Sequence, residues 1–397
     1  MRVGWVALAA ILLWSAALAD DGVVNPTSAQ HLGPEDGYED SVGAVDEISS
    51  YPDHPAPLPP SGKRSHAASI DELAGDTDFS LHDCDCCCTK CGGVQFFGPL
   101  PLTNTHPPMQ MFLSPTPDSA VMLEDGAGFY SVDLDVSTII IRELDSGVIA
   151  DYDLETWRLT ASYRQGMGDG EVFASLPLIS RGAGVMDSVI RGWHGMFSLP
   201  NALRDTLPDN QYHYVIVTRD GPVLNGSPGS GLGDLTVGYK MKLWDRGDGK
   251  DAAALRAAVK LPTGDSGQYY SSGAIDVMVG ALYQRQVSAR MRSYFNLDYV
   301  VIGEPDLQNI DRQDIGSLMF ATEYALGRST TMQAMYQALG NPLRIGSGEA
   351  DKSTQQLSAG IAHRIGRGAV WSGSFSEDIY PETAPDFVLS TGIRWEF

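Results

Sequence analysis

The chain has 397 residues, 43% of them hydrophobic, and its net charge at neutral pH is −23. This hydrophobic fraction is too low for a membrane protein built from helices, and beyond residue 19 no stretch approaches the roughly 18 consecutive apolar residues of a transmembrane helix. The acidic balance excludes the basic surface of a nucleic-acid-binding protein, so we expect no nucleic acid partner.

The first 19 residues have the pattern of a secretory signal peptide. Arg2 precedes an apolar run from Val3 to Leu13, and Ala17-Leu18-Ala19, with small residues at both ends, forms a cleavage site before Asp20. No cysteine follows that site, which argues against a lipid anchor. The pattern therefore predicts an exported bacterial protein.

Residues 20–83 predict a disordered leader. They are acidic, poor in aromatic residues, and contain the proline-rich stretch Tyr51–Pro60. Such a composition buries too little apolar surface to offset the entropy of ordering, and its prolines favour an extended polyproline course. We expect the leader to be a tether or spacer in the periplasm.

Residues 84–93 contain all five cysteines of the chain, which are Cys84, Cys86, Cys87, Cys88 and Cys91. An odd number cannot pair fully within one chain, and adjacent cysteines pair only with strain. One interpretation is a thiolate site for a soft metal such as Zn(II) or Cu(I), with His82 as a further ligand. The other is a set of disulfides in an oxidising compartment. Apart from such a metal, we expect no cofactor.

From about Phe96 onward, apolar and polar residues alternate in long segments. Leu235, Val237 and Tyr239, for example, alternate with Thr236 and other polar residues or glycine. Alternate residues of a strand face opposite sides, and the segment lengths suit tilted strands that cross a bilayer. The candidate strands are residues 127–140, 154–166, 170–181, 231–244, 251–262, 274–287, 289–303, 315–327, 330–341, 353–366, 369–379 and 385–397.

The connections between these strands alternate between short and long. Short turns fall near 166–170, 244–250, 287–289, 327–330 and 366–368, and longer loops near 142–153, 182–230, 263–273, 303–314, 341–352 and 380–385. Outer-membrane barrels show this asymmetry and an even strand number. The sequence thus predicts an all-β fold, a transmembrane antiparallel β-barrel of about twelve strands over residues 94–397. The strand-like segment Tyr212–Arg219 is placed inside the 182–230 loop, and fourteen strands are the alternative.

Residues 183–210 predict a helix within the longest loop. Asp187 is a candidate N-cap, Ile190, Trp193, His194 and Phe197 follow at helical spacing, and Pro200 ends the run. The amphipathic helix would either fold into the barrel as a plug or gate, or cap the loop on the outer rim. We expect His194 to be a hydrogen-bonded structural histidine.

The final strand ends on an aromatic residue. Phe387, Leu389, Ile393, Trp395 and Phe397 share one parity, which we expect to face lipid, with the last two in an aromatic girdle. This ending resembles the C-terminal signature of bacterial outer-membrane proteins, which the barrel-assembly machinery recognises. The resemblance implies an outer-membrane location.

A second resemblance covers most of residues 120–397. SGLGDLTVGYKMKLW (Ser230–Trp244), AALRAAVKLPTGDSG (Ala253–Gly267) and a D..I..WH..F stretch from Asp187 to Phe197 resemble segments of an uncharacterised family of bacterial outer-membrane barrels, a domain of unknown function. That family is related to barrels of aromatic-compound degradation clusters, such as those of the phenol meta-pathway. The resemblance implies fold and location, and no defined activity.

The inward-facing parity of the predicted strands is rich in charge. Our pore-lining candidates are Asp133, Asp135, Arg158, Arg164, Asp234, Lys240, Lys242, Asp276, Arg290, Arg292 and Asp298. A water-filled lumen of this kind would pass small molecules, and its Arg and Lys would favour anions, whereas a lumen braced by ion pairs would be closed. Twelve strands lie between barrels filled by side chains and porins with open channels, so size alone does not decide.

We therefore expect a passive channel or transporter for small, hydrophobic or anionic molecules. The alternative is a closed structural or partner-binding barrel. An outer-membrane hydrolase is the least supported class, because no nucleophile motif of the G-x-S-x-G kind occurs. We expect no enzymatic activity.

Overall fold

The computed structural model describes residues 94–397, apart from residues 146, 198–201, 247–248, 347–349 and 380–383. The predicted signal peptide, leader and cysteine cluster lie outside the described residues and remain predictions. All described residues belong to one compact unit. Among them, no helix has both the length and the apolar character needed to span a membrane.

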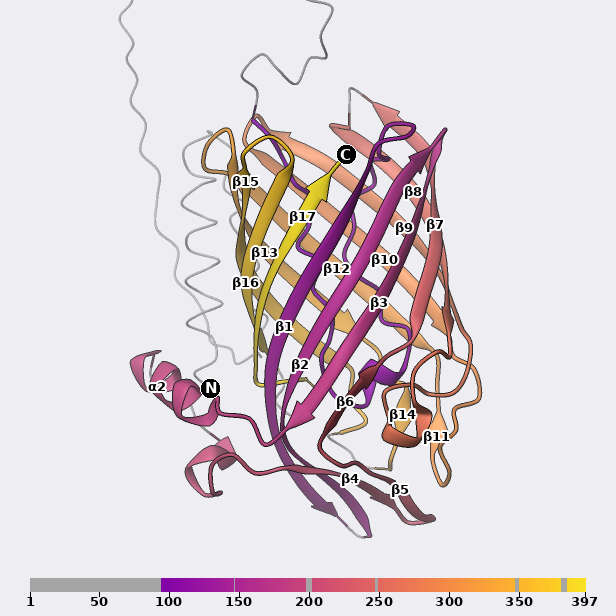
Figure 1. Cartoon of the computed structure of the whole chain (residues 1–397), viewed down its shortest axis with the longest axis vertical. Helices are drawn as coiled ribbons and strands as arrows, with labels where there is room; N and C mark the ends of the chain where they lie inside the picture. Colours follow the sequence, from indigo (N-terminus) through magenta and orange to yellow (C-terminus); the bar gives the residue numbers. More distant parts are fainter. Residues whose placement is uncertain (1–93, 146, 198–201, 247–248, 347–349, 380–383) are drawn as a thin grey trace, which may run out of the picture. The chain divides into compact units, whose positions relative to one another are not determined.

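Twelve antiparallel strands form a closed barrel (Figure 1). They are β1 Gly128–Asp145, β2 Val148–Met167, β3 Gly170–Gly182, β7 Leu235–Arg246, β8 Asp251–Leu261, β9 Asp276–Ser288, β10 Met291–Val301, β12 Ile315–Ala325, β13 Thr330–Leu339, β15 Thr354–Ile365, β16 Ala369–Asp378 and β17 Phe387–Glu396. The last strand closes the ring on the first, in a register that runs from Phe129 opposite Glu396 to Thr138 opposite Phe387. The predicted fold class and strand number are confirmed.

The remaining elements belong to the connections and to the segment before β1. They are the short strands β4 His213–Thr218, β5 Gly221–Asn225, β6 Gly229–Leu232, β11 Asp311–Arg312 and β14 Leu343–Arg344, helix α2 Asp187–Phe197, and the 3-10 turns η2 Met109–Met111, η3 Ala202–Asp205 and η4 Ser266–Gln268. Strand β4 pairs with Ile149–Asp153 of β2, beyond the ring of twelve. The segment Tyr212–Arg219 therefore adds no barrel strand.

One predicted loop is wrong. We expected residues 142–153 to form a loop, but β1 continues to Asp145 and β2 starts at Val148, so the two strands extend past the ring as a hairpin. The reason is burial: Ile139, Ile141 and Val148 join an apolar core there, which holds the strand pairing together.

This apolar core covers the barrel end that carries the long loops, hereafter the long-loop end. The opposite end carries the short turns and Phe397 and is called the short-turn end. The core, hereafter the cap core, includes Met111, Phe112, Leu113, Ile139, Ile141, Tyr152, Leu154, Tyr214, Ile216, Leu224, Ile302, Ile315, Leu343 and Ile345. Burial of so many apolar side chains keeps water out of this end of the lumen.

The two faces of the wall have opposite chemistry. On the outside, Val279, Leu297 and other large apolar side chains are half exposed or more, as expected of a surface surrounded by lipid. On the inside, polar side chains are buried, among them Lys240, Arg256, Lys260, Asp276, Gln284, Asn296, Asp298, Glu323 and Gln333. At the short-turn end Tyr130 and Tyr163 lie against Phe397, with ring centroids 5.1 and 6.3 Å from it.

Candidate functional site

The barrel lumen is occupied by the chain itself. Residues 94–123, hereafter the luminal segment, run inside the ring before β1 begins (Figure 1, indigo). The segment starts at the short-turn end, where Arg364 donates a hydrogen bond to the Gln95 side chain at 2.6 Å. It reaches the long-loop end at Met111, whose carbonyl accepts a hydrogen bond from the Ser272 amide at 3.1 Å. It then returns, and the amide of Leu123 donates to Glu171 of β3 at 3.2 Å.

Wall side chains satisfy the backbone of the outgoing half. The Phe97 amide donates to Glu323 of β12 at 2.8 Å, and the Leu100 amide donates to Gln333 of β13 at 3.0 Å. Gln333 in turn donates to the Gly98 carbonyl at 2.8 Å. Buried backbone groups need such partners, and here wall carboxylates and amides take the place of a neighbouring strand.

The returning half is held in the same way by the adjacent strands β9 and β10 of the wall. The Leu113 amide donates to Asp276 of β9 at 2.9 Å, and the Ala120 amide donates to Gln284 at 3.0 Å. Asn296 of β10 accepts from the Asp118 amide at 2.8 Å and donates to the Asp118 carbonyl at 2.9 Å. The buried polar side chains of β8–β13 thus serve to bind the luminal segment.

An ion cluster, hereafter the Asp118 latch, holds the returning half of the luminal segment. Asp118 is the one acidic residue of this segment, residues 94–123. The Asp118 carboxylate lies 2.7 Å from Arg164 of β2 and 3.3 Å from Lys240 of β7. Glu171 of β3 contacts the same two cations, at 3.0 and 3.2 Å. Two wall cations therefore face two carboxylates, one of them supplied by the luminal segment.

A second cluster lies near the long-loop end. Lys260 of β8 lies 2.6 Å from Asp234 and 3.3 Å from Asp276, and it donates to the Met111 carbonyl at 2.9 Å. Arg256 pairs with Asp298 at 2.8 Å. It also donates to the carbonyl of Thr116 at 2.7 Å. These cations are neutralised, so they provide no basis for the predicted preference for anions.

The structure brings most of the predicted pore-lining residues to the lumen. Asp133, Asp135, Arg158, Arg164, Asp234, Lys240, Asp276, Arg292 and Asp298 lie on the inner parity of the wall, where Arg292 stacks over the Phe96 ring at 4.4 Å. Lys242 and Arg290 lie elsewhere. Lys242 pairs with Asp169 of a short turn at 2.6 Å, and Arg290 is exposed in another short turn.

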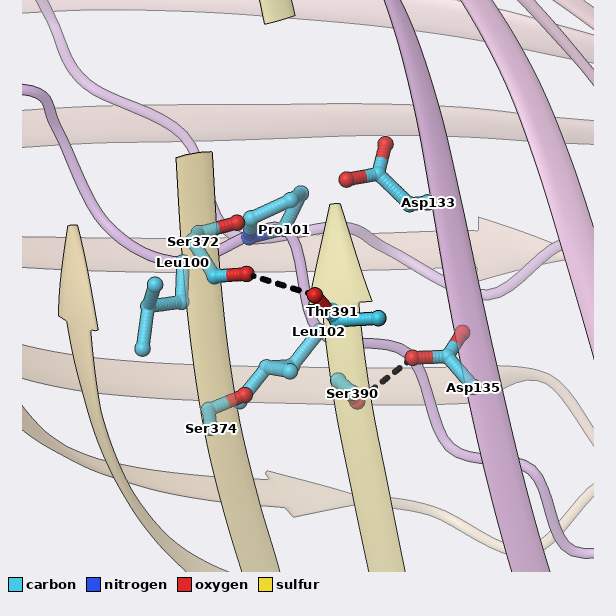
Figure 2. Close-up of a pocket in the computed structure, with 9 residues that line it drawn as sticks. All are labelled: Leu100, Pro101, Leu102, Asp133, Asp135, Ser372, Ser374, Ser390 and Thr391. Carbon is cyan, nitrogen blue, oxygen red and sulfur yellow. Dashed lines mark hydrogen bonds between the residues drawn. The ribbon is translucent and has the colours of Figure 1, made fainter. Parts of the chain in front are cut away.

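A pocket lies beside the luminal segment on one side of the lumen. Figure 2 shows this small pocket between the luminal residues Leu100–Leu102 and the wall of β1, β16 and β17. Asp133, Asp135, Ser372, Ser374 and Ser390 of its wall face inward and are hereafter called the hydroxyl strip, and the outward-facing Thr391 also borders the pocket. Asp135 accepts a hydrogen bond from Ser390 at 2.5 Å, and Asp133 accepts one from Ser131 at 2.9 Å. Serines are too short to reach the luminal segment as the longer side chains opposite do.

The predicted plug helix lies outside the lumen. In α2, Trp193 packs on Phe375 of β16 and Phe387 of β17, with ring centroids 6.0 and 6.1 Å apart. Both phenylalanines share the outward parity of Trp371 and Leu389, which are exposed on the barrel surface. The luminal role predicted for the helix residues Asp187, Ile190, Trp193 and His194 is therefore corrected. The side chain of the fifth candidate, Phe197, lies outside what the structure describes. The apolar face of this helix finds an apolar surface on the outside of the wall, whereas the lumen is polar.

Polar contacts fix α2 in this place. The amides of Val185 and Met186 both donate to Glu155 of β2 at 3.0 Å. Arg204, buried beneath the helix, pairs with Asp187 at 3.5 Å and with Asp386. Burial raises the pKa of Asp386 above its ordinary value, while Arg204 acts in the opposite direction.

Sequence reasoning missed the luminal segment, which is the main occupant of the site. Its stretch from Phe96 to Leu113 is rich in apolar residues, but they do not recur with the period of a strand or of a helix. The reason is that the side chains of this stretch face several strands of the surrounding wall. A signal was nevertheless present, since so many apolar residues outside any strand must be buried somewhere. Within the described residues, no group of three or more His, Cys, Asp or Glu is placed to hold a metal ion, and the five cysteines lie outside that range.

Comparison with known proteins agrees with this architecture. No curated protein sequence matches the chain. The solved COG4313 outer membrane channel from Pseudomonas putida F1 is similar in fold, with 14% sequence identity and a TM-score of 0.52 over 71% of this chain and 99% of that chain. The NanC porin is more distant, with 7% identity and a TM-score of 0.39 over 68% and 100% of the two chains. The model of the family described as "Protein of unknown function (DUF3187)" matches residues 92–397, and the chain therefore belongs to this family.

Proposed function

We propose that this protein is an outer-membrane channel for small molecules, with the luminal segment as its gate. The observation that carries the proposal is the way the lumen is filled. In small barrels the wall side chains fill the interior, but here a separate stretch of chain does so. A segment held by side-chain hydrogen bonds can leave without breaking the ring of twelve strands, and its departure would expose a polar passage.

The likeness in fold to a solved outer membrane channel supports the class of function. It says nothing of the solute. The resemblance to barrels of aromatic-compound degradation clusters favours small hydrophobic molecules, whereas the hydroxyl strip favours polar ones. We propose small polar solutes, because serine and carboxylate oxygens of the strip line a pocket beside the luminal segment.

The test is the ionic current through the full chain, refolded into a planar bilayer. Discrete openings would support the channel. The alternative is a closed structural barrel, and the tightly bound luminal segment and the cap core favour it. A folded barrel without current, both intact and after removal of the luminal segment, would support this alternative. We propose no enzymatic activity.

The orientation is a further part of the proposal. Short turns face the periplasm in bacterial outer-membrane barrels, so we place the short-turn end and the leader there. The aromatic C-terminal strand would be the part that the barrel-assembly machinery binds. Protease protection of a tag placed before residue 94 in intact cells tests this placement, and cleavage from outside would contradict it.

The hydroxyl strip leads to a prediction about ion selectivity. Among the ion pairs of the described residues, none includes Asp133 or Asp135, whereas Lys240, Arg256 and Lys260 are paired. Arg158 and Arg292 belong to none of these pairs either, but Arg292 stacks on Phe96, and Arg158 lies opposite only one of the two aspartates, Asp135. The strip therefore keeps a net negative charge, and open channels should prefer cations, contrary to the sequence-based expectation. Replacing both aspartates, as Asp133→Asn with Asp135→Asn, should abolish most of that preference, because it removes the charge and keeps the shape. The measurement is the reversal potential in a salt gradient.

A matched control is Asp169→Asn, since Asp169 is exposed in a short turn and pairs with Lys242. This variant should keep the reversal potential of the unmodified protein. Selectivity that is unchanged in the double variant would place the ion path elsewhere in the lumen, without contradicting the channel itself.

A further inference from the structure

We propose that helix α2 lies at the interface between the headgroups and acyl chains of the outer leaflet. It would contact lipid there through an apolar stripe that faces away from the barrel. The stripe, hereafter the lipid stripe, consists of Val185, Val189 and Met196, which are 68%, 56% and 75% exposed. Val189 and Met196 are seven residues apart and lie on one side of the helix, and Val185 lies just before the helix. The inference concerns the outer surface and does not depend on whether the lumen conducts.

The three sides of the helix differ in a way that fits such a boundary. One side is buried against the barrel through Ile190 and His194. The second side is the lipid stripe. The third side is polar and carries Ser188 and Arg191. Arg191 is partly exposed and pairs with Asp209. A helix in the interface plane needs one apolar and one polar side in this arrangement, in addition to its attachment to the wall.

The height of α2 on the wall agrees with this placement. Phe387 and Thr138 face outward and lie opposite each other, yet both are buried, and Trp193 of the helix packs on Phe387. The next outward residue of β17, Leu389, is exposed with the rest of the apolar surface. The lipid-facing surface therefore continues directly up to the helix.

The opposite aromatic girdle gives the distance across the apolar band. Thr138 lies eight residue steps along β1 from Tyr130, which lies beside Phe397 at the short-turn end. At about 3.3 Å per residue and a tilt of about 40°, this corresponds to roughly 20 Å along the membrane normal. The apolar band of such barrels is about 25 Å tall, so α2 lies at its far edge. Trp157, half exposed in β2 and paired with Val136, lies close to the same level.

Lipid explains the lipid stripe better than a second protein does. A soluble loop would leave Val189 and Met196 in water with no compensating contact, although the same helix carries polar residues on an adjacent side. The stripe is also narrow, with three large side chains separated by Gly192. Acyl chains can adapt to a surface of this kind without matching its shape.

The test uses site-specific fluorescence in the full chain. All five cysteines lie in residues 84–91, so replacing them with serine leaves no cysteine in the barrel. A single cysteine is then introduced as Val189→Cys or Met196→Cys and labelled with a polarity-sensitive dye. The protein is placed in vesicles of phosphatidylcholine and phosphatidylglycerol that contain nitroxide lipids, with the nitroxide either near the headgroup or at the end of the acyl chain.

We expect a blue-shifted emission and a loss of fluorescence for both labels, strongest with the nitroxide near the headgroup. Ser188→Cys is the matched control on the polar side, and its label should be quenched by a water-soluble agent instead. Leu389→Cys reports a position on the wall, and heat-modifiable gel mobility shows that each variant is folded.

Two outcomes would overturn the inference. Labels at positions 189 and 196 that respond to the water-soluble agent as strongly as the label at 188 would place the helix in water. Labels shielded from both kinds of quencher would show that protein covers the lipid stripe, and cross-linking between copies would then identify a second copy of the chain.

Discussion

Replacing residues 96–122 with a short Gly-Ser linker is expected to turn a barrel with rare openings into one that carries steady current. The two ends of the deletion lie at the same barrel end, since Gln95 contacts Arg364 and Leu123 contacts Glu171, so a flexible linker can join them. The deletion also removes Met111–Leu113 from the cap core, and so weakens the seal at the long-loop end. Single-channel recording in a planar bilayer measures the result.

The ring should survive this deletion. Its twelve strands keep every strand-to-strand hydrogen bond, and the wall carboxylates and amides that lose the segment become hydrated in an open lumen. Heat-modifiable mobility checks the fold. As a matched control, deletion of the α2 residues 187–196 should leave the barrel closed, because that helix lies on the outside. A folded barrel without current after the luminal deletion would contradict the gate and favour a structural barrel.

Asp118→Asn is expected to release the luminal segment part of the time and raise the open probability. The substitution keeps the shape of the side chain but removes one of the two carboxylates that face Arg164 and Lys240. Asp118, Glu171 and Lys240 are buried, and Arg164 is 16% exposed. Breaking a buried ion pair from one side costs about 3–5 kcal/mol. At about 1.4 kcal/mol for each tenfold change, even the lower figure shifts the equilibrium toward the released segment by roughly 100-fold.

The Asp118 latch can be separated from general damage by a second substitution. In the Asp118→Asn background Arg164 and Lys240 share the single carboxylate of Glu171, so Lys240→Met removes the surplus cation and should restore part of the closure. Asp209→Asn, at an exposed ion pair with Arg191, should leave the open probability unchanged, since exposed pairs contribute little. Equal open probabilities for Asp118→Asn and the unmodified protein would show that the segment is held mainly by its backbone contacts.

The barrel was predictable because its signal is local. Each strand alternates with period two, and the short turns recur at one end, so strand number and fold class follow from the order of residues alone. The hairpin at residues 139–153 was missed because its strand pairing depends on the cap core, whose members come from β4, β5 and the luminal segment.

The sequence by itself determined the ring of twelve strands, its apolar outer face and the charges of its inner face. Only the tertiary structure decided what fills the ring and on which side α2 lies. An amphipathic pattern states that a face must be buried but not against what, and Trp193 finds Phe375 and Phe387 on the outer wall. The luminal segment has no period to reveal it, because its backbone bonds to side chains such as Glu323, Gln333 and Asn296, which the folded ring alone brings together.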